Sequence, residues 1–169
     1  MDDKLIGEIV EGIVRGYKAG KASPSPAMKE RETKTVTLAK ALALCDAVKA
    51  RATEMGVKAV VCVSDSGGHP ILVECMDDAY IASYDVAVGK AFTVVSLKMS
   101  TAQLKPLAQP GASLYGIQFT NSGKIVIFGG GEPLTDNAGS VVGGLGVSGG
   151  SEEQDTALAA FGREYFDLM

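Results

Sequence analysis

The stretch 57–98 constrains the fold of this chain more than any other. It reads VKAVVCVSDSGGHPILVECMDDAYIASYDVAVGKAFTVVSLK. The apolar run at 57–64 predicts a buried strand, the Asp-Ser-Gly-Gly sequence after it has hairpin-turn chemistry, and 70–76 predicts the partner strand. The acidic pair at 77–78 is expected to open a helix that ends near Lys98, because carboxylates stabilise the positive end of a helix dipole. A strand hairpin followed by a long, largely buried helix is therefore predicted.

The remainder of the chain predicts further helices and strands of both kinds. Apolar residues recur at helical spacing in 3–19, 36–55 and 152–168. A capping box of Ser151 and Gln154 precedes the last of these helices. Three more strands are predicted at 124–128, 132–135 and 140–148, separated by glycine-rich turns. Hairpin-type connections among five strands predict an α+β fold with a largely antiparallel sheet and helices packed on it.

The chain divides into a short N-terminal part and one core domain. Prolines, serines and a run of charges at 21–34 are typical of a linker. The amphipathic helix and this linker therefore form a segment over 1–34, and the domain occupies 35–169.

Composition and charge argue against several classes of partner. The formal net charge is −4, so we expect neither nucleic acid nor an anionic membrane surface as a partner. No segment approaches the roughly 20 apolar residues that span a bilayer, and the acidic start MDDKLIGEIV does not resemble a signal peptide. Three cysteines without a C-x-x-C pair are typical of reduced thiols in a cytoplasmic protein and not of a structural zinc site.

Four ordered sequence blocks resemble a known family. They are the D-x-G-G-H turn at 65–69, the C-M-D-D-A junction at 75–79, the D-V-A-V-G-K-A helix at 85–91 and the G-V-S-G-G-S-E-E-Q-D ending at 146–155. In these blocks the chain resembles the GlcG/HbpS/PduO C-terminal-domain family. The resemblance covers about residues 35–168.

The resemblance implies a profilin-like or PAS-like fold with α/β/α layers and a five-stranded sheet. It also implies homo-oligomers. Several relatives bind haem or sense its degradation, and others act beside glycolate use or cobalamin-dependent diol and glycerol use. The function that it implies is an oligomeric accessory protein of such a pathway that binds a small molecule, with haem or another tetrapyrrole as the first candidate and any other cofactor unknown.

Five residues form the predicted ligand site: His69, Met76, Asp77, Asp85 and Lys90. The imidazole of His69 is a good axial ligand for haem iron, and the thioether of Met76 is a softer one. The two carboxylates suit a hard cation. The ammonium of Lys90 suits an anionic group such as a propionate.

Each of these residues also has a structural interpretation. His69 follows a Gly-Gly turn and precedes Pro70, as in a solvated loop, and some haem-binding relatives place the axial histidine on the first core helix, where 36–55 has none. Met76 fits the core, and the carboxylates fit helix capping and a charged helix face. Lys90 is equally able to pair with a nearby carboxylate; the candidates are Asp85 and Asp155.

The sequence favours a binding protein over an enzyme, and no catalytic residue is assigned. One histidine without a nucleophile elbow supports no Ser-His-Asp triad, and no nucleotide-binding glycine motif is present. Two other functions stay open: an enzyme or cofactor-maintenance factor acting on corrinoid or haem, and a scaffold subunit. The helix at 3–19 fits either an arm that packs on another subunit or a tag for a pathway enzyme or a bacterial microcompartment in the cytoplasm.

Overall fold

The structure is a computed structural model that describes residues 8, 11–12, 15 and 35–169. Two compact units are present, Met1–Glu32 and Thr33–Met169. The four described residues of the first unit are helical. The rest of the helix predicted at 3–19 lies outside the described residues.

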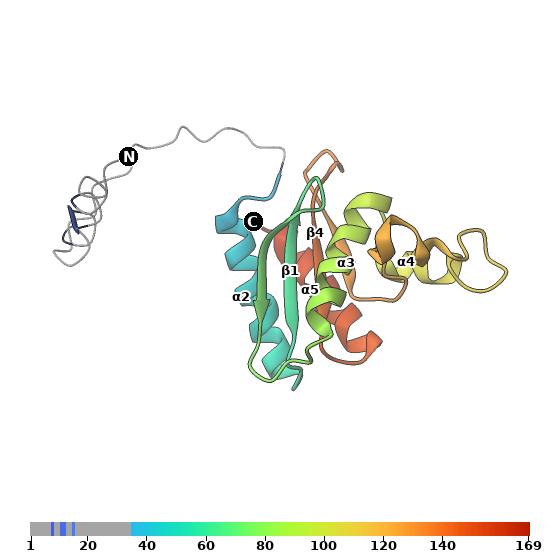
Figure 1. Ribbon diagram of the computed structural model, residues 1–169, viewed down its shortest axis with the longest axis horizontal. Helices are drawn as coiled ribbons and strands as arrows, with labels where there is room; N and C mark the ends of the chain where they lie inside the picture. Colours follow the sequence, from blue (N-terminus) through green and yellow to red (C-terminus); the bar gives the residue numbers. More distant parts are fainter. Residues whose placement is uncertain (1–7, 9–10, 13–14, 16–34) are drawn as a thin grey trace. The chain divides into compact units, whose positions relative to one another are not determined.

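The second unit is a sandwich of helices on both faces of one sheet (Figure 1). Its elements are α2 (Leu38–Glu54), β1 (Val60–Asp65), β2 (Pro70–Cys75), α3 (Ser83–Leu97), α4 (Thr101–Leu107), β3 (Gly131–Thr135), β4 (Val141–Ser148) and α5 (Glu152–Asp167), with 3-10 turns at Ile117–Phe119 and Asn121–Gly123. The four strands lie in the order β2–β1–β4–β3, and every neighbouring pair is antiparallel. The predicted α+β class and antiparallel sheet are therefore confirmed.

The central strand β1 is buried on both faces, which explains its continuous apolar run. Val61 and Val63 belong to the main core, which β1 and β4 form with α2 and α5. Val60 and Cys62 face the other way, into a smaller core with α3. Alternate side chains of a strand point to opposite faces, so a strand between two helical layers needs apolar residues at every position.

The glycines of β4 allow α3 to approach the sheet closely. A Cβ added at Gly146 would overlap the carbonyl oxygen of Ala87, and one at Gly144 would overlap that of Ala91. Both carbonyls belong to the backbone of α3, which cannot move away cheaply. The glycine pattern that interrupts this strand is therefore a packing requirement of the α3 layer.

The helix termini follow the local sequence signals. Thr37 caps α2, its hydroxyl accepting a hydrogen bond from the backbone N–H of Lys40, and Gly56 follows that helix with φ +67°. Ser151 and Gln154 form the predicted capping box at the start of α5. The prediction of this capping box is therefore confirmed; such a box depends only on residues three positions apart in the sequence.

The strand predicted at 124–128 is absent, so the sheet has four strands and not five. This segment runs along α3 instead. The backbone N–H of Val126 donates to the hydroxyl of Thr93 at 2.9 Å, and Ile125 is buried. The apolar pattern correctly indicated burial, but the backbone binds a helix side chain and not a strand.

The acidic pair does not open the long helix, contrary to the prediction. Helix α3 begins at Ser83, and Asp78 lies in a turn with φ +62°. Pairing with β1 continues past β2, because Met76 N–H donates to the carbonyl of Ala59 at 3.0 Å. The chain must then cross from the sheet edge to the α3 face before a helix can start. Asp85, in the first turn, takes the dipole-stabilising position instead.

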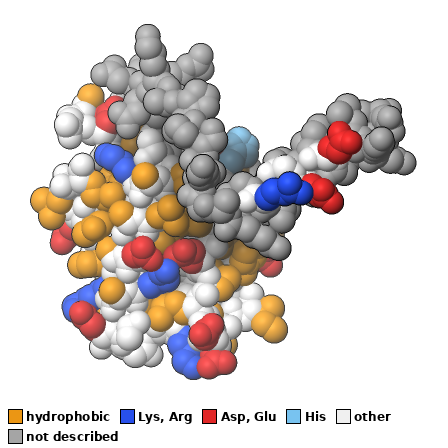
Figure 2. Space-filling model, turned by 90° about the vertical axis from the view of Figure 1, so that its left-hand side faces the viewer, with side chains coloured by type: hydrophobic (Ala, Val, Ile, Leu, Met, Phe, Trp, Pro, Cys, Tyr) orange, Lys and Arg blue, Asp and Glu red, His pale blue; other side chains and the backbone are white. Residues whose placement is uncertain are grey.

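Apolar side chains remain exposed on the outer face of α2, which Figure 2 shows among charged groups. Leu38 is 56% exposed and Leu42 is 42% exposed, one helical turn apart. None of the helices in the described part of the chain combines the length and hydropathy that a membrane span needs.

We expect Gly146→Ala to destabilise the core domain by about 1–3 kcal/mol, because the new methyl group would force α3 away from β4. Urea denaturation followed by circular dichroism measures this change. An unchanged midpoint would show that α3 does not contact the sheet as closely as described.

Candidate functional site

The fold separates the five predicted ligand residues. His69 lies at the tip of the β1–β2 hairpin, whereas Met76 and Asp77 follow the last residue of β2. A six-residue strand at about 3.3 Å per residue puts these two ends about 20 Å apart. Asp85 is exposed on α3, and Lys90 is buried where α3 packs on the sheet. Within one chain, no single pocket therefore contains all five residues.

The hairpin turn holds the backbone of His69 and leaves its side chain exposed. One carboxylate oxygen of Asp65 accepts the backbone N–H groups of Gly67 at 2.8 Å and His69 at 2.9 Å. Nδ1 of the imidazole lies 3.5 Å from the same oxygen, and the side chain is 83% exposed. A Cβ at Gly67 would lie 2.9 Å from Nδ1, so glycine is needed for the ring to lie against the turn. The D-x-G-G-H block therefore presents an accessible imidazole.

The ammonium of Lys90 binds groups inside the protein. Its side chain is 0% exposed, and its ammonium donates to Asp155 Oδ2 at 2.8 Å and to the carbonyl of Val147 at 2.7 Å. The ammonium also lies 5.0 Å from the ring centre of Phe128. Burial lowers the pKa of Lys90, and the carboxylate of Asp155 acts in the opposite direction. Of the two pairings left open, the one with Asp155 is present, and ligand contact would require breaking it.

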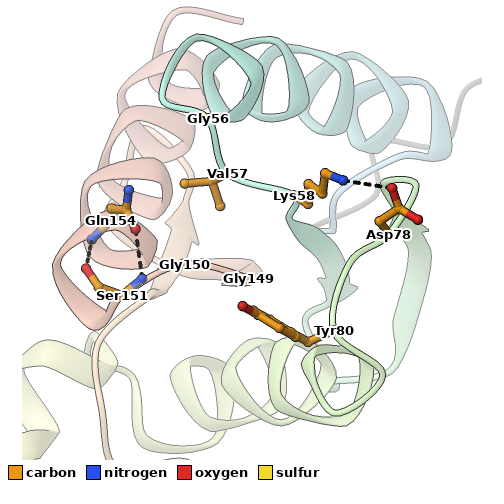
Figure 3. A pocket seen from close by; sticks show the side chains of 9 residues that line it. All are labelled: Gly56, Val57, Lys58, Asp78, Tyr80, Gly149, Gly150, Ser151 and Gln154. Atoms are coloured by element: carbon orange, nitrogen blue, oxygen red, sulfur yellow. Dashed lines mark hydrogen bonds and ion pairs between the residues drawn. The ribbon is translucent and has the colours of Figure 1, made fainter.

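An open cleft of about 620 Å³ lies at the end of the sheet where β1 begins (Figure 3). Its lining is largely polar: Gly56, Val57, Lys58, Asp78, Tyr80, Gly149, Gly150, Ser151 and Gln154. Lys58 Nζ lies 2.7 Å from Asp78 Oδ2 across one side. Tyr80 points into the cleft from the α3 side, opposite the capping box of α5. The cleft is thus built where β1, the β2–α3 turn and α5 meet.

A second cleft of about 530 Å³ shares the segment 56–58 with the first. It is lined by Lys49, Thr53, Gly56, Val57, Lys58, Cys75, Met76 and Asp77. Met76 and Asp77, two of the predicted ligand residues, therefore line this cleft. The sulfur of Met76, however, already accepts the backbone N–H of Ala59 at 3.3 Å.

Sequence reasoning missed Lys58 and Tyr80, which lie between and beside these clefts. Lys58 is the charged residue next to the apolar strand, and its partner Asp78 is 20 positions away. A lysine beside an otherwise apolar strand was the one sequence signal that could have drawn attention to this position. Its partner depends on the turn after β2, which the sequence does not specify.

The thiols differ strongly in their environment. Burial raises the pKa of Cys45 and of Cys62 to about 12, whereas Cys75 is exposed. Cys45 and Cys62 therefore stay protonated at neutral pH, and neither is available as a thiolate nucleophile or ligand. In residues 35–169, no three His, Cys, Asp or Glu side chains lie together as a metal site would require.

The family described as haem degrading protein HbpS-like matches residues 36–164. This match covers most of the core domain. The chain therefore belongs to the HbpS-like family, as the four sequence blocks predicted.

Relatives of known sequence agree with this assignment. The chain is 46% identical over 141 residues to an uncharacterized 15.0 kDa protein in the dhaT–dhaS intergenic region of Citrobacter freundii, covering 83% of this chain and 99% of that protein. It is 37% identical over 151 residues to the corrinoid adenosyltransferase PduO of Salmonella typhimurium, covering 89% of this chain. The matching part spans only 44% of PduO.

Solved structures share the fold. The Klebsiella pneumoniae protein ORFY is 42% identical with a TM-score of 0.78, covering 86% of this chain and 99% of that one. The PduOC–haem complex is 38% identical with a TM-score of 0.74, covering 77% and 94%. A double mutant of HbpS from Streptomyces reticuli is 28% identical with a TM-score of 0.72, covering 85% and 97%. The profilin-like arrangement that the resemblance implied is therefore supported.

We expect one thiol per native chain to react with a disulfide reagent at pH 8, and three after denaturation. A thiol with a pKa near 12 is ionised in only about one molecule in 10⁴ at that pH, and Cys45 and Cys62 are also shielded. Absorbance of the released thiolate measures the count. Rapid native reaction of all three would contradict the burial of Cys45 and Cys62.

We expect Lys90→Met to destabilise the protein by about 3–5 kcal/mol, because the carboxylate of Asp155 would remain buried without its cation. Combining it with Asp155→Asn should cost less than the sum of the two single replacements. Lys58→Met is the matched control, since its pair with Asp78 is exposed and its loss should leave the urea midpoint nearly unchanged. Urea denaturation measures all four variants, and additive costs would show that the buried pair is not coupled.

Proposed function

We propose that this protein binds a tetrapyrrole, with haem as the first candidate and His69 as the iron ligand. The observation that carries the proposal is the imidazole of His69, which is 83% exposed on a turn held by Asp65. Two findings support it. The chain belongs to a family described by haem chemistry, and a relative 38% identical has been solved as a haem complex.

The side chains at the hairpin tip are chemically suited to bind haem iron. A neutral imidazole is a common axial ligand of haem iron. Bound haem would supply the iron to which the imidazole nitrogen of His69 binds. The carboxylate of Asp65 lies beside Nδ1. A carboxylate in that position orients the ring and strengthens its other nitrogen as a donor. The turn therefore offers one ligand and its supporting group together.

The cleft beside Cys75 is the other location that the structure offers for the same ligand. Its volume of about 530 Å³ lies within the range of about 300–1,000 Å³ that small-molecule sites occupy. Thiolate and thioether sulfurs also bind haem iron, and lysines pair with carboxylates. Here, however, Met76 is engaged with Ala59, and Lys58 with Asp78. The hairpin tip is therefore the stronger site.

The proposed role is that of an accessory protein beside cobalamin-dependent diol or glycerol use, in the cytoplasm or inside a microcompartment. The relatives named for the dhaT–dhaS region and for corrinoid adenosyltransferase support this setting. Homo-oligomerisation is part of the proposal, and the exposed Leu38 and Leu42 of α2 support it. Action on corrinoid or haem as an enzyme, a scaffold role and a contact through 3–19 stay predictions.

We expect the full-length protein to shift the haem absorption band in the Soret region when haemin is titrated in. His69→Ala should abolish this shift or weaken binding at least about tenfold, because the axial nitrogen is lost. Cys75→Ser is the matched control, since it alters an exposed ligand-type residue at the other end of the hairpin and should bind like the unchanged protein.

Each other result is informative. Loss of binding in Cys75→Ser with retention in His69→Ala would move the site to the cleft. Absence of any shift in the unchanged protein would overturn haem binding. Thermal denaturation of each variant shows whether a loss of binding reflects unfolding.

A further inference from the structure

The two edges of the sheet differ in the backbone groups that they leave free. Strand β3 forms one edge and β2 the other, since each pairs with a single neighbour among the described strands. In an antiparallel pair, alternate residues bond to the neighbouring strand, and the residues between them point their N–H and C=O groups away from it. These outward groups decide whether an edge can accept a further strand.

The β3 edge has its outward donors removed or engaged. The N–H of Val147 donates to the carbonyl of Gly130 at 2.8 Å. By alternation, Gly131 and Pro133 of β3 then point their backbone groups outward. The hydroxyl of Thr101 accepts the N–H of Gly131 at 2.9 Å, and Pro133 has no N–H. This edge is therefore closed to a further strand, in the way that proline and covering groups close natural sheets.

The β2 edge keeps its outward donors. The N–H of Met76 donates to the carbonyl of Ala59 at 3.0 Å, and the register with β1 continues without a shift as far as Leu72. By the same alternation, Val73 and Cys75 point their N–H and C=O groups away from β1. Val73 is partly buried and Cys75 is exposed. Both backbones are thus available for pairing with another strand.

The side chains beside this edge offer apolar surface without a free charge. The one charged side chain of β2, Glu74, is turned to α2, where its carboxylate lies 2.6 Å from Nζ of Lys49. On the α3 face, Val73 and Val88 are only partly buried. Tyr84, one helical turn before Val88, is 49% exposed. A strand added here would bury apolar side chains as well as bond the backbone.

We propose that β2 pairs antiparallel with β2 of a second copy of this chain, which joins the two sheets into one. Two identical strands are self-complementary across a two-fold axis. A register centred on Val73 places Glu74 opposite Leu72 of the second copy, so that like charges do not face each other. This inference rests on the homo-oligomerisation in the proposed function and specifies its surface. It does not depend on haem.

The first test measures the mass of the full-length protein in solution by analytical ultracentrifugation over a range of concentrations. Val73→Pro removes an outward N–H and leaves the bonds to β1 intact, which is where edge strands tolerate proline. It should raise the dissociation constant of the assembly at least about tenfold. Val73→Thr is the matched control, because it is β-branched and keeps the N–H, and it should assemble like the unchanged protein. Circular dichroism shows whether both variants are folded.

The second test is a cross-link that does not depend on the proline variant. Val73→Cys, combined with Cys75→Ser, should form a covalent dimer on mild oxidation. Opposite Cα atoms of a bonded antiparallel pair lie about 5.5 Å apart, which a disulfide spans. Ser66→Cys with Cys75→Ser is the matched control, since this exposed position lies at the hairpin tip, far from the two-fold axis. Cys45 and Cys62 are buried and do not contribute.

The outcomes separate this inference from the proposed function. If the unchanged protein is a monomer at every concentration, homo-oligomerisation fails and this inference fails with it. If the protein assembles but folded Val73→Pro assembles equally well, pairing through β2 is wrong while homo-oligomerisation stands. The same holds if Val73→Cys cross-links no more than Ser66→Cys. Haem binding at His69 is decided separately, by the haemin titration.

Discussion

The buried ion pair between Lys90 and Asp155 is the contact on which the three layers depend. It joins α3 to the start of α5, and the same ammonium binds the carbonyl of Val147 in β4. The other oxygen of Asp155 accepts the N–H of Gly150 at 2.9 Å. Burying two charges is costly unless each finds its partners, so these groups fix how the helices lie on the sheet. Gly130 completes the arrangement, since a Cβ there would lie 2.6 Å from the ammonium.

This contact explains what the family resemblance means physically. Lys90 belongs to the block at 85–91, and Asp155 ends the block at 146–155. Two of the four blocks therefore meet in one structural interaction, together with the glycines that let α3 approach β4. Their presence identifies the fold and carries little information about a ligand. The block at 65–69 differs, because its histidine is exposed and Gly67 leaves room for that ring beside Asp65.

Local signals in the sequence were sufficient for much of the fold. The run at 57–64, the hairpin turn and the capping box of α5 each depend on residues close together in the chain, and all were predicted. The failures involve competition between distant groups. The segment 124–128 binds Thr93 in place of a strand, and Asp78 lies in a turn where it pairs with Lys58 and not at the start of α3. The clefts likewise form between segments that are distant in the sequence, so they could not be found by pattern.

The exposure of His69 also limits what kind of binding this chain can provide alone. Burial of apolar surface contributes about 25 cal/mol per Å², and an exposed turn removes little of a flat macrocycle from water. In the proposed site, the bond between iron and the imidazole would then have to supply most of the affinity. The proposed site would therefore favour exchange of its ligand over permanent retention. A second surface that covers the ligand would change this balance, since it would add apolar burial that one subunit lacks.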